Sequence, residues 1–266
     1  MTILVTGGAG YIGSHAIKNL KKQGYSVVAI DNLILGHKEF FEVLKVPLII
    51  GEISDKNLIR KILKGEFYIK KNQNVDEIGP ITAVMHFAAF TNVGESVTNP
   101  LKYYKNNVCD SFSLLEAIVE ENFRRDKYKS NNLNQIPFVF SSTCATYGIP
   151  DKLPINEETK QNPINPYGKG KLIIENFLND FGKAYKLKSI IFRYFNVAGA
   201  DPLTNLGELH IPETHLIPLI FDTILGRRKE LEIYGDNYPT KDGTCIRDFI
   251  HVEDLVNAHI LGLNQI

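Results

Sequence analysis

The sequence has few of the features that mark secreted, membrane-spanning or nucleic-acid-binding proteins. Its three cysteines, Cys109, Cys144 and Cys245, are odd in number and widely spaced, which argues against a disulfide framework or a cysteine zinc site. Lysine plus arginine equals aspartate plus glutamate at 30 each, so no net charge attracts nucleic acid or an acidic membrane. No apolar run approaches the length of a membrane span, and no leader pattern follows Met1. We therefore expect a cytoplasmic protein without a bound metal, a nucleic-acid partner or a membrane segment.

The residues that are present indicate a folded α/β protein. Apolar residues make up 44% of the chain, which is enough for a sizeable core. Short apolar runs without alternation are typical of strands covered on both faces, and they occur at 3–6, 26–30, 83–87, 138–141 and 189–192. Helix-like stretches lie at 12–23, 56–64, 100–121, 166–185, 216–225 and 251–262. This alternation predicts a doubly wound parallel sheet of the Rossmann type.

The chain changes character near Asn196, where proline, glycine and threonine become frequent. We predict a Rossmann-like domain over 1–195 and a smaller, loop-rich C-terminal lobe over 196–266, from which helix 251–262 could pack back on the first domain. Two stretches rich in lysine and asparagine, 64–74 and 122–135, are interpreted as surface insertions.

A glycine-rich loop follows the first predicted strand and opens the first helix. Gly7 permits a tight turn, Gly10 allows a pyrophosphate to approach the backbone, and Gly13 allows close packing of helix and strand. Asp31 ends the second strand, where a carboxylate would accept both ribose hydroxyls and repel a 2′-phosphate. A strand-end or turn aspartate is the alternative. The loop and the aspartate together predict NAD as the cofactor in preference to NADP.

Tyr167 and Lys171 stand four residues apart in the fourth predicted helix, so both side chains lie on one face. Asn165 is its expected N-cap and Pro166 its first residue. An ammonium beside the phenol would stabilise the phenolate, which could then act as a base near neutral pH. Thr143, at the end of a strand, could bind the same substrate oxygen, although such hydroxyls often only cap their own strand. The three side chains together predict an alcohol-oxidising site.

Several longer motifs give the chain a family resemblance. They include Val5–Thr6–Gly7–Gly8–Ala9–Gly10–Tyr11–Ile12–Gly13, Asp31–Asn32–Leu33, His86–Phe87–Ala88–Ala89, Val93–Gly94–Glu95–Ser96, Arg193–Tyr194–Phe195–Asn196 and Arg247–Asp248–Phe249–Ile250–His251. With these motifs the chain resembles the extended short-chain dehydrogenase/reductase family, and within it most closely the UDP-glucose (UDP-galactose) 4-epimerases. The resemblance runs from Met1 almost to Ile266.

The resemblance implies an NAD-dependent isomerase of galactose metabolism. In such enzymes the C4 hydroxyl is oxidised, the 4-keto sugar rotates, and hydride returns to the other face. It further implies a UDP-hexose substrate and a pair of helices, 100–121 and 166–185, that could meet across a homodimer. The apolar faces of these helices suit the core of one chain equally well. The cofactor-binding residues would be Gly7, Gly10, Tyr11, Ile12, Gly13, Asp31, Asn32, Glu52, Ile53, Phe87, Ala88, Ala89, Asn107 and Phe195. The substrate-binding residues would be Asn196, Leu216, Tyr234 and Arg247.

Two alternatives stay open besides another nucleotide-sugar epimerase of the same family. A nucleotide-sugar 4,6-dehydratase shares the fold and the Tyr/Lys pair, but that family has an Asp-Glu pair after the threonine, where this chain has Cys144 and Ala145. An NAD-binding module without activity is the second alternative, because family members continue beyond the point that corresponds to Ile266, and we expect the C-terminal lobe to be incomplete. A surface salt bridge to an aspartate is an alternative use of Arg247.

Overall fold

The first part of the chain is built on a six-stranded parallel sheet. The sequence predicted the doubly wound parallel sheet but not its edge strand β3. In the computed structural model, which describes residues 1–71, 74–128, 133–203 and 206–266, the strand order is β3-β2-β1-β6-β7-β8. The strands are β1 Thr2–Thr6, β2 Ser26–Asp31, β3 Leu48–Ile50, β6 Ala83–His86, β7 Phe138–Ser141 and β8 Ser189–Phe192. The order reverses between β1 and β6, so the carboxyl ends of these two strands flank the crevice where doubly wound folds bind ligands.

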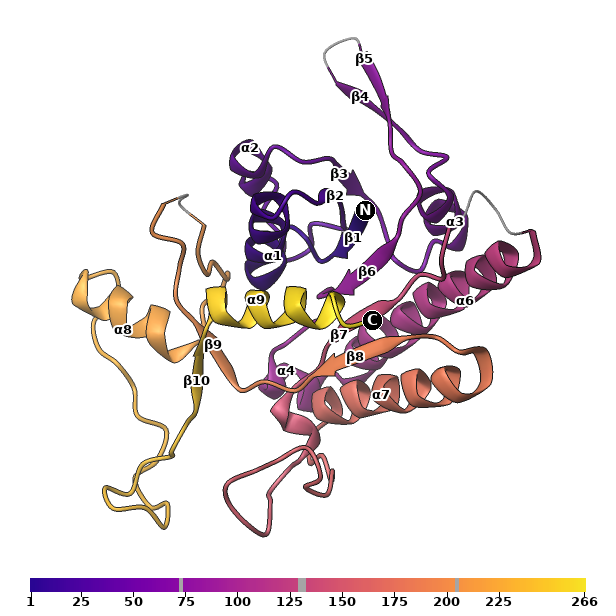
Figure 1. Cartoon of the computed structure of the whole chain (residues 1–266). Helices are drawn as coiled ribbons and strands as arrows, with labels where there is room; N and C mark the ends of the chain where they lie inside the picture. Colours follow the sequence, from indigo (N-terminus) through magenta and orange to yellow (C-terminus); the bar gives the residue numbers. More distant parts are fainter. Residues whose placement is uncertain (72–73, 129–132, 204–205) are drawn as a thin grey trace.

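Helices cover both faces of the sheet (Figure 1). The α-helices in the described residues are α1 Tyr11–Lys22, α2 Phe40–Leu44, α3 Lys56–Lys64, α4 Val93–Thr98, α5 Pro100–Tyr103, α6 Ser111–Tyr128, α7 Pro166–Tyr185, α8 Leu216–Ile224 and α9 Val252–Leu263. Of these, α8 lies apart from the sheet in the C-terminal lobe (Figure 1). Along β1 the side chains alternate between two cores: Leu4 packs with α3, α6 and α7, whereas Ile3 and Val5 pack with α1 and α9. Both faces are therefore buried, which explains the continuous apolar runs of the strands.

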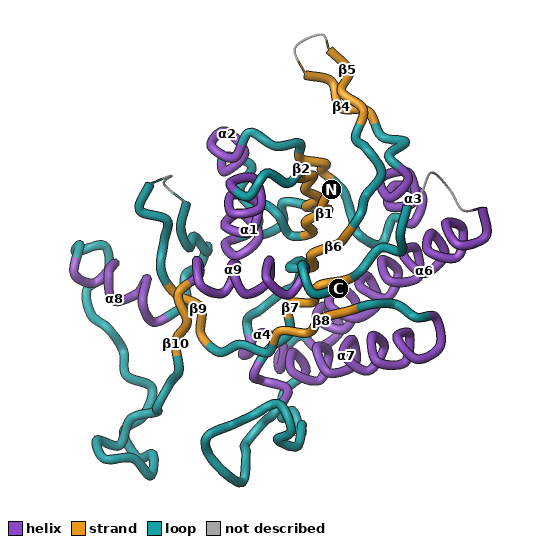
Figure 2. The backbone as a smooth tube through the Cα atoms, viewed as in Figure 1, coloured by secondary structure: helices purple, strands orange, loops and turns teal. Residues whose placement is uncertain are grey.

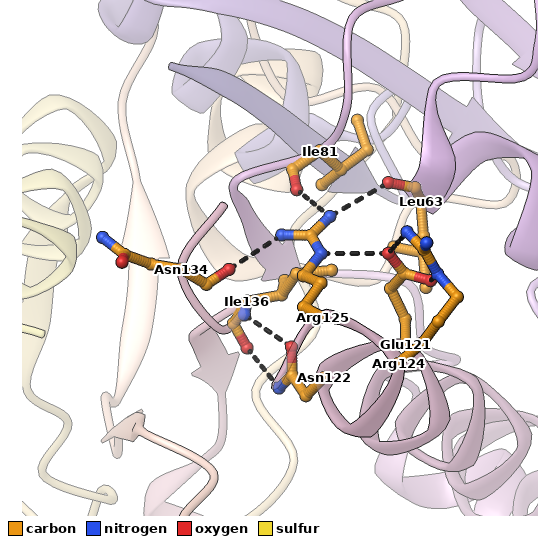
Figure 3. A network of polar contacts seen from close by, with 8 residues as sticks. All are labelled: Leu63, Ile81, Glu121, Asn122, Arg124, Arg125, Asn134 and Ile136. Carbon is orange, nitrogen blue, oxygen red and sulfur yellow. Dashed lines mark hydrogen bonds and ion pairs between the residues drawn. The ribbon is translucent and has the colours of Figure 1, made fainter. Parts of the chain in front are cut away.

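The predicted helix 100–121 is longer and less regular than expected. It consists of α5, a π-helical turn over Tyr104–Asp110, and α6, which continues to Tyr128. The interpretation of 122–135 as a surface insertion is therefore wrong for 122–128, which continue α6. Residues 134–135 are at least partly exposed, and 129–132 lie outside the described residues. Asn122 exchanges hydrogen bonds with the main chain of Ile136, and the fully buried Arg125 donates to the carbonyl oxygens of Leu63, Ile81 and Asn134 (Figure 3). These polar side chains stabilise the junction of four segments, which their composition alone does not reveal.

Short strands were missed by the sequence analysis. β3 pairs with β2 at the sheet edge, and β9 Asn196–Ala198 pairs in parallel with β10 Phe249–His251 in the C-terminal lobe. β4 Tyr68–Lys71 and β5 Asn74–Glu77 form an antiparallel hairpin that projects from the domain in Figure 1. Part of this hairpin lies in the predicted insertion 64–74, of which residues 72–73 lie outside the described residues.

The C-terminal lobe consists largely of loops, as Figure 2 shows. Every residue of α8 is at least partly exposed. From β10 the chain returns to the first domain as α9, whose Glu253 binds Lys18 and Asn19 of α1. His259 of the same helix stacks on Phe192 of β8 with ring centroids 4.2 Å apart. Helix α9 therefore forms part of the sheet's covering layer, and β10 leads into it from the lobe.

Within the described residues, no helix is both long enough and apolar enough to cross a bilayer. All three cysteines are free thiols.

Candidate active site

The glycine loop between β1 and α1 has the backbone geometry that its sequence predicted. Gly7 has a φ of +68°, and a Cβ there would lie 2.6 Å from the Ala88 nitrogen. A Cβ on Gly13 would lie 2.1 Å from the Gly7 oxygen, so a side chain is excluded where α1 packs on the loop. At Gly10 the nearest atom is the Gly7 oxygen at 3.3 Å, so this position is less crowded. The loop is thus tightly packed against its neighbours at Gly7 and Gly13, and it is less crowded at Gly10, next to the N-terminus of α1.

Asp31 lies at the end of β2 beside this loop. Its carboxylate accepts hydrogen bonds from the main-chain nitrogens of Ala9 at 3.0 Å and Leu33 at 2.8 Å. Burial raises the pKa of Asp31, and the two hydrogen bonds oppose that rise. The neighbouring Asn32 donates to Glu52, which follows β3. The two acidic side chains thus converge on the loop edge, where an adenosine ribose would be recognised by its hydroxyls.

The other predicted cofactor residues lie on several elements around the carboxyl ends of the strands. Tyr11 begins α1 and donates its hydroxyl to the Gly199 oxygen at 2.5 Å. Ile12 packs beside the small core cluster formed by Tyr11, Ala16, Val252 and Val256, and Ile53 is buried in the core below β3. Phe87 packs against His259 with ring centroids 5.1 Å apart. Ala88 and Ala89 follow β6, and Phe195 is half-buried after β8.

Asn107 lies in the π-helical turn and clamps the segment that follows β6. Its side chain accepts a hydrogen bond from the Phe90 nitrogen and donates one to the Phe90 oxygen, both at 2.9 Å. The irregular turn therefore orients a buried amide toward the backbone of the predicted cofactor site. Asn107 thus holds the main chain at Phe90, in the segment that follows β6.

Helix α7 presents Tyr167 and Lys171 to the carboxyl end of β7. As predicted, Asn165 caps the helix by accepting from the Gly168 nitrogen at 2.8 Å, and Pro166 is the first helical residue. The Tyr167 nitrogen also donates to Ser96 Oγ, which belongs to α4. Both Tyr167 and Lys171 are buried. The Asn165 cap and the contact with Ser96 fix the first turn of α7, and with it the position of Tyr167.

The Lys171 ammonium is directed at the strand end. Its Nζ donates to the Ser141 oxygen at 2.7 Å and lies 4.9 Å from the centre of the Phe140 ring. Burial lowers the pKa of Lys171 to about 7, and the nearby Glu175 carboxylate opposes the shift. A lysine in this state changes its charge near neutral pH.

The phenol of Tyr167 is held in its neutral form by its surroundings. Burial raises its pKa, while a hydrogen bond with Thr143 lowers it. We expect the Lys171 ammonium to lower this pKa; among the protein's own groups burial has the largest effect and raises it, and the ammonium donates to the Ser141 oxygen. Thr143 lies two residues after β7 and caps the following turn by accepting from the Ala145 nitrogen. Its side chain is also the hydrogen-bond partner of the Tyr167 phenol.

A buried ionic network lies under these residues and was missed by the sequence analysis. The Glu175 carboxylate is fully buried and receives hydrogen bonds from Ser142 Oγ, Gln161 Nε2 and the Arg193 guanidinium, whose Nη2 lies 2.7 Å away. Glu175 follows Lys171 by four residues on the same helix, a spacing that could have indicated it. The network connects the strand ends of β7 and β8 to the catalytic face of α7.

The predicted substrate residues lie in or beside the C-terminal lobe. Asn196 begins β9 and donates to the Asp248 oxygen at 2.8 Å, which places it beside the chain at Arg247. The Arg247 charge is close enough to lower the pKa of Cys144, the residue after Thr143, although burial raises that pKa overall. Leu216 begins α8 and is exposed, and the exposed Tyr234 donates to Glu232. Asn196 thus lies beside the chain at Arg247, and Leu216 and Tyr234 are exposed in the lobe.

Taken together, the parallel sheet, the glycine loop and the acidic strand end define the class of Rossmann-like, dinucleotide-binding proteins. Comparisons with known proteins agree with this class. The model of the NAD dependent epimerase/dehydratase family matches residues 3–266. The chain belongs to this family.

Named relatives are epimerases. A UDP-glucose 4-epimerase of Lactobacillus helveticus is 47% identical over 265 residues, which cover 100% of this chain and 72% of that protein. The crystal structure of UDP-glucose 4-epimerase from Brucella ovis in complex with NAD has a TM-score of 0.86 at 45% identity, over 99% of this chain and 73% of that one. The enzyme from Bifidobacterium longum in complex with NAD⁺ and UDP has a TM-score of 0.84 at 34% identity, over 100% of this chain and 75% of that one.

Proposed function

We propose that this protein is an NAD-dependent enzyme that interconverts UDP-galactose and UDP-glucose by inverting C4 of the sugar. The observation that carries the proposal is the placement of Tyr167, Thr143 and Lys171 at the carboxyl end of β7, within a fold whose glycine loop and Asp31 fit NAD. The relatives named above support the substrate.

The cofactor roles rest on shape and on hydrogen-bonding groups. Gly7, Gly10 and Gly13 would allow the pyrophosphate to approach the N-terminus of α1, and Asp31 would accept the ribose hydroxyls. Asn32 and Glu52 would extend the same edge, and Tyr11, Ile12 and Ile53 would form its apolar wall. Phe87, Ala88, Ala89, Asn107 and Phe195 would line the nicotinamide side. NAD, when bound, supplies the electron acceptor that takes a hydride from C4 and later returns it.

The protein's own residues manage the proton and the orientation of the sugar. Tyr167, as its phenolate, would take the proton of the 4-hydroxyl, and Thr143 would hold the same oxygen through a hydrogen bond. Because burial raises the pKa of Tyr167, a positive charge beside the phenol is needed to form the phenolate. Lys171 supplies one when it is protonated, and its pKa of about 7 makes that supply depend on pH.

Inversion requires that the sugar turn between the two hydride transfers, so affinity must come from the UDP group. A guanidinium such as Arg247 suits a diphosphate, because its planar fork makes paired charge-assisted hydrogen bonds. Asn196 lies next to it on the paired strands β9 and β10. Leu216 and Tyr234 would complete the nucleotide contacts from α8 and the following loop.

Incubation with UDP-galactose and NAD tests this function. We expect UDP-glucose to form without added reductant, because the hydride returns to the substrate. A 4-keto-6-deoxy sugar as the product would refute epimerisation and favour a dehydratase. Absence of any product from a chain that binds NAD would favour the inactive module.

We also propose that the chain forms a homodimer through α6 and α7. Phe112, Phe123 and Tyr185 are exposed on these two helices. Their rings belong to one continuous series of contacts, in which Phe112 meets Phe181, Phe181 meets Tyr185, and Tyr185 meets Phe123. The expected result is a particle of twice the 30.0 kDa chain mass in light scattering, and a monomer for Phe123→Glu.

A cytoplasmic location stays our proposal for the compartment, supported by the three free thiols.

A further inference from the structure

Four metal-ligating side chains converge in a short segment before α8. Glu208, His210, Glu213 and His215 each offer one donor atom, and these four atoms lie within 4.8 Å of one another. His215 Nδ1 lies 3.0 Å from Glu208 Oε1 and 2.9 Å from Glu213 Oε1. His210 Nδ1 lies 3.4 Å from Glu208 Oε1 and 3.5 Å from Glu213 Oε2. Each imidazole nitrogen thus faces both carboxylates.

These nitrogen-to-oxygen separations are close to the edge length of a tetrahedral zinc site, although they involve both oxygens of Glu213. The four donor atoms together span up to 4.8 Å, so binding would draw the side chains closer to one another. Four ligand atoms at about 2.0 Å from a central Zn²⁺ lie about 3.3 Å from each other. The measured nitrogen-to-oxygen separations, from 2.9 to 3.5 Å, bracket that value. Two imidazoles with two carboxylates form a mixed nitrogen and oxygen donor set, which suits Zn²⁺ better than Mg²⁺ or Ca²⁺, whose ligands are oxygen atoms.

Burial gives an independent reason to expect a ligand. The side chains of Glu208 and Glu213 are only 8% and 12% exposed, so two carboxylates lie close together with little access to water. The Nδ1 atom of His210 is buried and has no hydrogen-bond partner within the described part of the chain. A cation between these groups would satisfy the unpaired nitrogen and neutralise the two carboxylates.

We propose that Glu208, His210, Glu213 and His215 form a Zn²⁺ site. The bound ion would hold together the segment from Glu208 to His215, which connects a contact with His37 to the start of α8. On one side, Leu209 accepts a hydrogen bond from His37, which follows the cofactor-side strand β2. On the other side, His215 directly precedes Leu216 and α8. A bound Zn²⁺ would therefore stabilise the start of α8, whose residues are all at least partly exposed.

The test uses the full chain, stripped with a chelator, and measures Zn²⁺ binding by calorimetry. We expect one Zn²⁺ per chain and a higher unfolding temperature when it is bound. The Co²⁺ form should show the strong visible absorption of a tetrahedral site without a thiolate charge-transfer band, because no cysteine is a ligand. A thiolate band, or no stoichiometric binding, would overturn the proposal; the second result would leave the cluster as histidine–glutamate ion pairs.

Variants assign the binding to the cluster. His210→Gln and Glu213→Gln should each weaken Zn²⁺ binding at least about 100-fold, since each removes one of four ligands. The matched control is His37→Gln, which alters a histidine that contacts the same segment but lies outside the donor set, and it should bind Zn²⁺ as the wild type does. Equal binding by wild type and by both cluster variants would refute the assignment. Circular dichroism of each variant confirms folding, and the Co²⁺ spectrum of the wild type tests the site without any substitution.

Discussion

The buried pair of Glu175 and Arg193 offers a sharp test of how the site is supported. Glu175→Gln keeps the shape of the side chain but removes its charge. Breaking a buried ion pair from one side costs about 3–5 kcal/mol. Arg193 keeps hydrogen bonds to the Tyr147 hydroxyl at 3.1 Å and the Glu157 oxygen at 3.2 Å, and its side chain is 20% exposed. We therefore expect a smaller loss of unfolding free energy, about 2–3 kcal/mol.

Thermal unfolding followed by circular dichroism measures this loss. For a chain of this size the expected decrease in Tm is about 4–12 °C. The matched control is Glu120→Gln, which removes the same charge from a surface ion pair. In that pair the side chains of Glu120 and Arg60 are 44% and 41% exposed. The control should lose no more than about 1 kcal/mol. If both variants unfold at the same temperature, the Glu175 network does not stabilise the site as we infer.

Three further predictions concern the cofactor loop and the lysine. Asp31→Ala should weaken NAD binding and relax the discrimination against NADP; unchanged discrimination in a binding titration would remove its ribose role. Gly13→Ala should lower NAD affinity at least about tenfold, because its Cβ would meet the Gly7 oxygen at 2.1 Å, whereas Gly79→Ala, with its nearest contact at 3.6 Å, should bind normally. The folded-state pKa of Lys171, about 7, lies below its ordinary value of 10.5, so the unfolded chain binds more protons between these values. The wild type should therefore gain stability relative to Lys171→Met as pH rises from about 7 toward 10. If urea unfolding gave the wild type and Lys171→Met the same pH dependence of stability, the lowered pKa of this buried lysine would be contradicted.

The sheet and the main helices could be predicted because their signals are local. β1, β2, β6, β7 and β8 are continuous apolar runs, and the doubly wound order that they form was confirmed. β3, β9 and β10 have three residues each and depend on pairing with distant segments, such as Ile49 with Ile30 and Ile250 with Val197. Such pairings leave no periodic pattern in a three-residue stretch.

The residues of the candidate site likewise fall into those with a local sequence signal and those that only the fold brings together. The glycine loop and the pair of Tyr167 and Lys171 are each carried by one short segment, so their spacing identifies them. The Glu175 network joins Ser142, Gln161 and Arg193 from three other segments, and only the fold brings them together. Asn122 and Arg125 were assigned to the surface because polar composition usually indicates exposure, whereas here their hydrogen bonds satisfy buried carbonyl groups.

The central claim is that Tyr167 is the base of an NAD-dependent epimerase, and Tyr167→Phe tests it most directly. The change removes one hydroxyl and leaves the ring, so NAD should bind as it does to the wild type. The rate of UDP-galactose conversion to UDP-glucose, measured with NAD saturating, should fall about 10²–10⁴-fold. Turnover near the wild-type rate would contradict the assignment of Tyr167 and, with it, our account of the site.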